Sequence, residues 1–288
     1  MLTTEHKNAR RDVMKNKLSA ALAFILIVLI TFGATACGDK KGYSGEFYVN
    51  PVKDEVEKLD DDQLYANAVK DAMIIDDDEI LPLVNITRDD DNVSWKGDKV
   101  LMAFMHKYPE SYPEEQDVQL QWGNVWCVSE KEICKWVREN GNGVVDWKLR
   151  LHQVLGMPVS KGYTTVTALW VDASLLYRPA NVTDPTAEMK ATYEKTGNDE
   201  FDAMYKEWFD SNIIWSYFDS AFPWTRLGYT YDWADNGKEY GLSEFLIFKG
   251  ADATVASKTK YSLHVSAARR FARIAKAVVC ARKPTTSK

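Results

Sequence analysis

The chain has 288 residues, and its 45% hydrophobic and 12% aromatic residues are ample for a packed core. Its net charge of -6 is unevenly distributed, because residues 39–252 hold 22 of the 36 basic residues and 40 of the 42 acidic ones, a net of -18. A body this acidic repels nucleic acid and anionic lipid, which excludes nucleic-acid binding as its expected function.

The first predicted element is an export signal. A short basic head at 14–17 precedes an uncharged apolar run at 18–32 and small residues that end at Cys37. This order is typical of a signal peptide. An uncleaved transmembrane helix is the alternative, because residues 18–38 carry no charge and are just long enough to span a bilayer.

Small residues directly before a cysteine resemble the lipobox of bacterial lipoproteins. In that class the cysteine is acylated and becomes the mature N-terminus. The resemblance therefore implies lipidation of Cys37 and a mature chain of 252 residues. It also implies a location in the bacterial cell envelope, outside the cytoplasm and anchored to a membrane. Met14 makes a better start for this signal than Met1, and both remain open.

Composition divides the chain into four predicted parts. These are a signal peptide at 1–37, a polar tether at 38–50, an acidic globular domain at 51–257 and a basic segment at 258–288. The last part has the pattern of a basic amphipathic helix. It could dock on the acidic body, contact anionic lipid of the envelope or remain undocked. We expect it to be dispensable for the fold.

Hydrophobic periodicity predicts a domain that mixes helices and strands. Helices are expected over 60–74, 129–140, 147–155 and 201–222, and strands over 99–105, 118–122, 125–128, 164–171 and 241–248. This mixture indicates the α+β class, with a mixed or antiparallel sheet packed with several helices in a single domain.

Three local patterns sharpen this prediction. Residues 123–124, Gly-Asn, suit a two-residue hairpin turn before the strand at 125–128. Ser129 and Glu132 have the spacing of a capping box. Trp208 and Trp215 lie seven residues apart on the apolar stripe of the 201–222 helix and are expected to face the core.

Four short runs carry a resemblance. They are Leu-His-Gln-Val-Leu-Gly at 151–156, Leu-Tyr-Arg-Pro at 176–179, Trp-Thr-Arg-Leu-Gly-Tyr-Thr-Tyr-Asp-Trp at 224–233 and Gly-Leu-Ser-Glu-Phe at 241–245. Together they resemble an uncharacterised group of exported bacterial proteins, over roughly residues 98–250. The resemblance implies export and one domain, and it carries no activity. The basic tail departs from these chains, which end soon after the Ser-Glu-Phe strand.

The pattern of metal-binding residue types predicts no metal and no cofactor. Beyond Cys37 the chain has Cys127, Cys134 and Cys280, an odd number that excludes a complete disulfide framework. Buried thiols are expected at Cys127 and Cys134 rather than a bridge. The acidic clusters at 76–79 and 89–91 lack the spacing of a calcium loop. The histidines and cysteines lack the paired spacing of zinc ligands.

The best candidate for a ligand site is the segment 224–233 with the strand that follows it. Arg226 can bind a carboxylate or phosphate in a bidentate manner, Asp232 can accept from sugar hydroxyls, and aromatic faces allow stacking. The candidate ligand-binding residues are Trp224, Arg226, Tyr229, Tyr231, Asp232, Trp233 and Glu244. The alternative is that the aromatic residues pack in the core while Arg226 and Asp232 pair with each other or with backbone.

The expected function is that of a lipid-anchored binding or interaction module, whose ligand is a small molecule, a glycan or a protein. The rival is an envelope hydrolase that uses Glu244, Asp232 and either His106 or His152. Residues 241–245 resemble the first half of a nucleophile elbow, but Phe245 replaces the second glycine. An enzyme would need its acid and base to converge in one cleft.

Overall fold

The structure is a computed structural model, and it describes residues 59–260. The predicted signal peptide, Cys37, the tether and the tail beyond residue 260 lie outside the described residues, so the predictions about them stay predictions. Within the described range, none of the helices combines the length and the apolar character that a membrane span requires.

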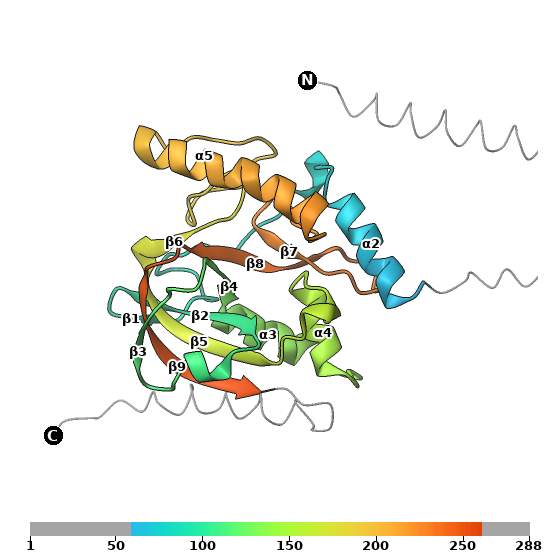
Figure 1. Ribbon diagram of the computed structural model, residues 1–288, viewed down its shortest axis with the longest axis horizontal. Coiled ribbons are helices and arrows are strands. Elements are labelled where there is room, and N and C mark those ends of the chain that lie inside the picture. The colour runs from blue at the N-terminus through green and yellow to red at the C-terminus, as the bar shows by residue number, and fades with distance from the viewer. Residues whose placement is uncertain (1–58, 261–288) are drawn as a thin grey trace, which may run out of the picture. The chain divides into compact units, whose positions relative to one another are not determined.

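Within residues 59–260, an antiparallel sheet of nine strands forms the framework (Figure 1), in the order β3-β9-β5-β2-β4-β8-β6, with β1 paired to β2 and β7 paired to β8. The strands are β1 (Trp95–Lys96), β2 (Lys99–His106), β3 (Asp117–Gln119), β4 (Val125–Ser129), β5 (Thr165–Asp172), β6 (Leu176–Tyr177), β7 (Tyr229–Tyr231), β8 (Tyr240–Ile247) and β9 (Asp252–Lys260). Strand β2 is buried on both faces after Lys99, as its continuous apolar run predicts.

The described part of the chain adds four α-helices to this sheet, namely α2 (Asp61–Asp71), α3 (Glu130–Asn140), α4 (Trp147–Val154) and α5 (Asp199–Ile214). Asp60 caps α2 and forms a capping box with Gln63. Helix α3 packs against β2 and β4, and α4 packs against β7 and β8, whereas α5 is drawn above β8 in Figure 1. The antiparallel sheet and the four helices form one domain and confirm the predicted α+β class.

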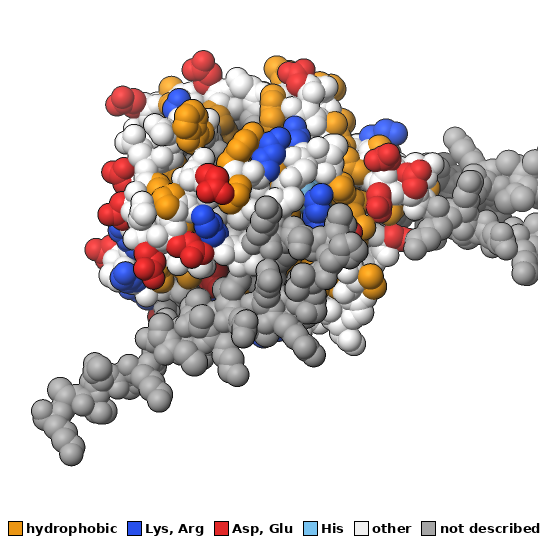
Figure 2. Space-filling view, turned by 60° about the horizontal axis from the view of Figure 1, so that its bottom comes forward, with side chains coloured by type: hydrophobic (Ala, Val, Ile, Leu, Met, Phe, Trp, Pro, Cys, Tyr) orange, Lys and Arg blue, Asp and Glu red, His pale blue; other side chains and the backbone are white. Residues whose placement is uncertain are grey.

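Side chains from the helices complete separate parts of the core. Helices α3 and α4 bury Ile133, Val137 and Leu151 against β2 and β4. Helix α5 covers an aromatic cluster, whose buried or partly buried members are Trp126, Tyr193, Phe201, Tyr205, Trp208, Phe209, Tyr217, Trp224, Tyr231 and Phe248. On the face in Figure 2, hydrophobic side chains reach the surface between charged ones, and many acidic side chains lie toward its left and right sides.

The predicted helix over 201–222 ends early. Helix α5 stops at Ile214, and the chain continues as a π-helical turn, η5 (Trp215–Asp219). A π-helix has more residues per turn, so each residue rotates less around the axis and the apolar stripe is displaced. Trp208 packs in the aromatic cluster as predicted, but Trp215 is 44% exposed, so the prediction that it faces the core is wrong.

The predicted hairpin through residues 123–124 is also wrong. Strand β3 pairs with β9, whereas β4 pairs with β2 and β8. The backbone of Leu120 bonds to Gly250 and Ala251, so the chain crosses from the edge of the sheet to its middle between residues 120 and 125. Strand β9, which lies between β3 and β5 in the sheet, extends to Lys260, beyond the domain end at 257 that composition predicts.

The capping box predicted for Ser129 and Glu132 does not form, because both side chains have longer-range partners. The Ser129 hydroxyl donates to the carbonyl oxygen of Asn92 instead of capping α3. The Glu132 carboxyl accepts from the backbone N–H of Ser243 at 3.1 Å and from its hydroxyl at 3.0 Å. These bonds tie α3 to β8 in place of the local cap.

Candidate functional site

The central strands of the sheet separate from one another. Strands β2 and β4 pair only at Met102 with Ser129 and at Ala103 with Val128. Beyond Ala103, β2 continues to His106 paired with β5 alone, and the first residues of β4 pair with β8 alone. The facing edges of 104–106 and 125–127 thus have no strand partner, and a cavity of about 400 Å³ reaches the residues on both edges.

The wall of this cavity is mainly apolar and aromatic. Its lining comes from β2 (Ala103, Phe104, Met105, His106), β4 and the loop before it (Leu120, Trp122, Gly123, Asn124, Val125, Trp126, Cys127, Val128), the segment after α4 (Leu155, Gly156, Met157, Tyr163), η5 and the segment after it (Trp215, Ser216, Phe222, Pro223, Trp224), β7 (Thr230, Tyr231), β8 (Glu244) and the loop after β2 (Tyr108, Tyr112). The volume lies within the range of small-molecule sites, which are mostly apolar with a few polar groups.

Among the described residues that line this wall, Glu244 is the only carboxylic acid. Glu244 lies on β8, opposite Val128 of the neighbouring strand β4, and its backbone N–H donates to the carbonyl oxygen of Gly228 at 2.9 Å. Its carboxyl makes no hydrogen bond or ion pair with any described residue. Burial raises the pKa of this carboxyl from its ordinary 4.5 to about 8. At neutral pH this carboxyl is therefore mainly in its neutral, protonated form.

Two other titratable groups at the wall, His106 and Cys127, are also neutral. Burial, and secondarily Lys258, lowers the pKa of His106 to about 4. Its Nδ1 accepts from the N–H of Tyr108 at 3.1 Å, so the proton is on Nε2, which donates to Thr167 Oγ1 at 2.7 Å. Cys127 is a buried free thiol whose pKa is raised by burial and by Glu244. Cys134 is a buried free thiol too, as predicted.

Of the predicted candidates, Trp224, Tyr231 and Glu244 line the cavity, and the others do not. The Arg226 guanidinium donates to the carbonyl oxygens of Ala72 at 3.3 Å and Met73 at 2.9 Å. Arg226 therefore links the 224–233 segment to the two residues that follow α2, in line with the alternative that it pairs with backbone.

Asp232 is buried and bound to Arg150, not to Arg226. Two guanidinium nitrogens of Arg150 lie 2.8 and 2.5 Å from the two carboxylate oxygens, the arrangement of a bidentate ion pair. The neighbouring Trp233 indole N–H donates to the carbonyl oxygens of His152 at 3.2 Å and Met157 at 3.1 Å. Tyr229 is buried in a separate hydrophobic cluster.

The residues expected of a hydrolase do not meet in one place. Glu244 and His106 line the cavity, whereas Asp232 lines a different hollow. His152 is fully buried, with Nδ1 2.7 Å from the carbonyl oxygen of Lys148. Ser243 lies buried inside β8 with its hydroxyl bound to Glu132, so it does not occupy the exposed turn of a nucleophile elbow.

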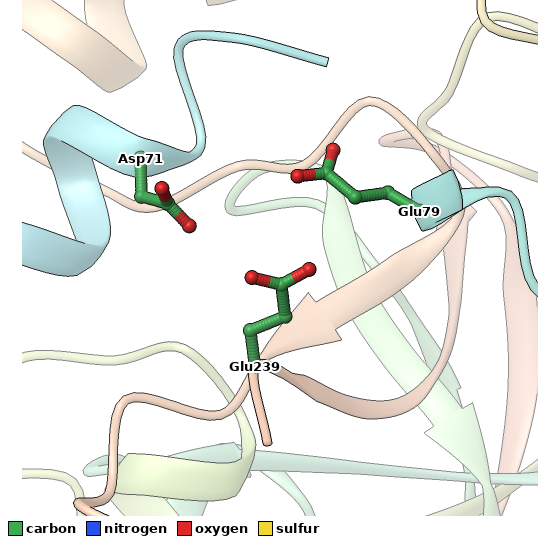
Figure 3. A group of neighbouring side chains, drawn as sticks. All are labelled: Asp71, Glu79 and Glu239. Carbon is green, nitrogen blue, oxygen red and sulfur yellow. The ribbon is translucent and has the colours of Figure 1, made fainter. Parts of the chain in front are cut away.

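Three carboxylates that are not among the predicted candidates form a group at the hollow that Asp232 lines. Ligand oxygens of Asp71, Glu79 and Glu239 all lie within 4.8 Å of one another, and Figure 3 shows the three side chains converging. Burial, together with Glu79 and Asp71, raises the pKa of Glu239 to about 7. Carboxylates suit Ca²⁺ or Mg²⁺, but three ligand groups are fewer than the six to eight oxygens that Ca²⁺ takes.

The residues of this group come from α2, from the 3₁₀ turn η1 (Asp77–Glu79) and from the loop before β8, so no local spacing marks them in the sequence. Tyr231 is the signal that links them to the predicted segment, because its hydroxyl donates to Asp71 at 2.8 Å.

Comparison with known proteins finds no matching family model, no matching curated protein and no matching solved structure. The resemblance drawn from the four short runs therefore stays a prediction.

Proposed function

We propose that the domain is a binding module held at the bacterial envelope by a lipid on Cys37, and that its cavity takes a small, mostly apolar ligand that carries an amine. The observation that carries this proposal is the Glu244 carboxyl, which is half-buried in the cavity wall and has no hydrogen-bond or ion-pair partner among the described residues.

A half-buried carboxyl without a protein partner is unfavourable for a fold, because it loses part of its solvation and gains no hydrogen bond or ion pair in return. A ligand ammonium beside Glu244 would supply the missing partner and favour the charged carboxylate. The surrounding rings would cover the apolar part of the ligand, and Trp126 and Trp224 already pack edge to face with centroids 6.0 Å apart. The cavity volume of about 400 Å³ favours a small molecule over a folded protein or a long glycan.

The amine is tested with two probes of similar shape and opposite charge, tryptamine and indole-3-propionate. The full-length protein in lipid nanodiscs is titrated calorimetrically, with protein-free nanodiscs as the blank. We expect tryptamine to bind at least tenfold more tightly than the acid at pH 8. Glu244→Gln should remove this preference, and Glu239→Gln, outside the cavity, should retain it.

The pH dependence adds a second readout. Tryptamine remains cationic between pH 6 and 8, while Glu244, with a pKa of about 8, must lose its proton to form the ion pair. Affinity should therefore rise by up to tenfold per pH unit to about pH 8 and then level off. Equal binding of the two probes, or a preference that survives Glu244→Gln, would show that Glu244 does not select the ligand.

The anchor is tested separately from the cavity. Cells that express the protein are given a labelled fatty acid, and the purified chain is assayed for the label. We expect the wild type to be labelled and Cys37→Ser to lose the label, because the small residues before Cys37 match the pattern of an acylated cysteine. Normal labelling of Cys37→Ser would favour the transmembrane alternative for residues 18–38.

A further inference from the structure

Four aromatic side chains both line the cavity and reach solvent at its mouth. They are Tyr108, Trp122, Trp215 and Phe222, and we call them the aromatic rim. Trp122 is 80% exposed, Tyr108 60% and Trp215 44%. Phe222 is partly exposed and stacks on Trp215, with ring centroids 5.2 Å apart.

The aromatic rim is assembled from separate parts of the chain. Tyr108 precedes a 3₁₀ turn, Trp122 lies in the crossing from β3 to β4, and Trp215 begins η5. The two features of the fold that sequence analysis did not predict, the crossing and the π-helical turn, thus bring Trp122 and Trp215 to the mouth. Large rings exposed beside an apolar cavity are unfavourable in water unless they have a partner surface.

Lysines accompany the aromatic rim even though the body is strongly acidic. The ammonium of Lys107 lies 5.7 Å from the ring centroid of Tyr108, and that of Lys161 lies 5.1 Å from the ring centroid of Phe222. Lys258 donates to the carbonyl oxygen of Pro109 at 3.1 Å. Glu110 and Asp219 are the acids closest in sequence to rim residues, and neither lines the cavity.

We propose that the aromatic rim docks on a phospholipid bilayer and that the ligand enters the cavity from the membrane interface. Tryptophan and tyrosine favour this interface because their rings are apolar at one end and polar at the other. Lysine stems can cover apolar surface while their ammonium groups reach lipid phosphates, a partner that complements Lys107 and Lys161. The proposal rests on the proposed function for what enters the cavity, but docking is measured independently of ligand binding.

The tryptophans make a selective test possible. All ten tryptophans of the chain lie between residues 95 and 233, and none lies in the predicted anchor or the basic tail. Full-length protein is reconstituted into phosphatidylcholine vesicles whose acyl chains carry bromine, a short-range quencher of indole fluorescence. Membrane contact by either terminal segment then leaves the emission unquenched, and only contact by the domain lowers it.

We expect the bromolipid to quench part of the wild-type emission. Trp122→Phe and Trp215→Phe should each remove a share of the quenched component, because phenylalanine keeps the surface apolar but removes the reporter. Trp122→Asp should also abolish the quenching of Trp215, since a charge at the centre of the contact opposes docking. Trp95→Phe is the matched control, because Trp95 is partly exposed but lies outside the rim, under the guanidinium of Arg88.

Absence of quenching in the wild type, or an unchanged quenched component in both phenylalanine variants, would overturn the docking proposal. The first result would assign the rim to stacking on a soluble ligand. Calorimetry with tryptamine on the wild type separates the two proposals, because it measures ligand binding and not membrane contact. Failure of the wild type to bind tryptamine counts against the proposed ligand and leaves the quenching result valid.

Discussion

Trp224→Ala should lower the free energy of unfolding by at least about 4 kcal/mol. Trp224 is 4% exposed and packs against Trp126, Trp208 and Phe209, with ring centroids 6.0, 6.0 and 5.0 Å away. Its indole N–H also donates to the carbonyl oxygen of Pro179 at 2.7 Å. Removing a buried tryptophan costs about 3–5 kcal/mol, and an unpaired carbonyl group adds about 1–3 kcal/mol.

Trp215→Ala is the matched control for this prediction. It removes the same side chain from a neighbouring segment, but Trp215 is 44% exposed and its one ring contact is with Phe222. A stacked pair of this kind contributes about 0.5–1.5 kcal/mol beyond its buried area. Urea denaturation of both variants measures the difference. Similar losses in the two variants would mean that η5 does not displace Trp215 from the core.

Much of this fold was predictable because the residues that are apolar in the local sequence pattern are also the residues that the folded domain buries. The apolar run of β2 is buried, and the α3 stripe at Ile133 and Val137 faces the sheet. Strand β9 escaped detection because lysines dominate its end, although Ala253 and Val255 are buried in alternation. That weak period-two pattern was the available signal.

Pairing partners and helix type were not predictable in the same way. A turn-forming Gly-Asn pair does not require that the two flanking strands pair with each other, and β3 pairs with β9 instead. In η5 the buried residues are Ser216 and Tyr217, whereas Trp215, Phe218 and Phe222 continue the α-helical spacing of apolar residues, so the sequence pattern favours an α-helix that the structure does not form.

The cavity depends on features that sequence does not encode locally. Glu244 was identified from its strand, but the gap that exposes its carboxyl arises where β2 and β4 separate. Arg226 and Asp232 were attractive candidates because of their residue types. Their partners, the end of α2 and Arg150, are distant in sequence, and so the structural use of these charges was hidden.

Glu244→Gln should stabilise the domain at alkaline pH and leave its stability nearly unchanged at pH 4.5. The pKa of Glu244 is about 8 in the folded domain and 4.5 for an ordinary glutamic acid. Between these values the folded state retains a proton that the unfolded state has released. The contribution of Glu244 to stability is therefore fully present below about pH 4.5 and is lost as pH rises to about 8.

The full displacement of this pKa corresponds to at most about 5 kcal/mol, and water entering the cavity reduces the measured effect to a few kcal/mol. Glutamine is uncharged at every pH, so the difference between variant and wild type should grow with pH and level off above 8. Glu139→Gln, at an exposed site on α3, controls for the loss of one negative charge from an acidic body. Urea denaturation from pH 4.5 to 9 provides the comparison. If Glu244→Gln follows the same pH profile as wild type, the Glu244 carboxyl is not held neutral in the folded domain.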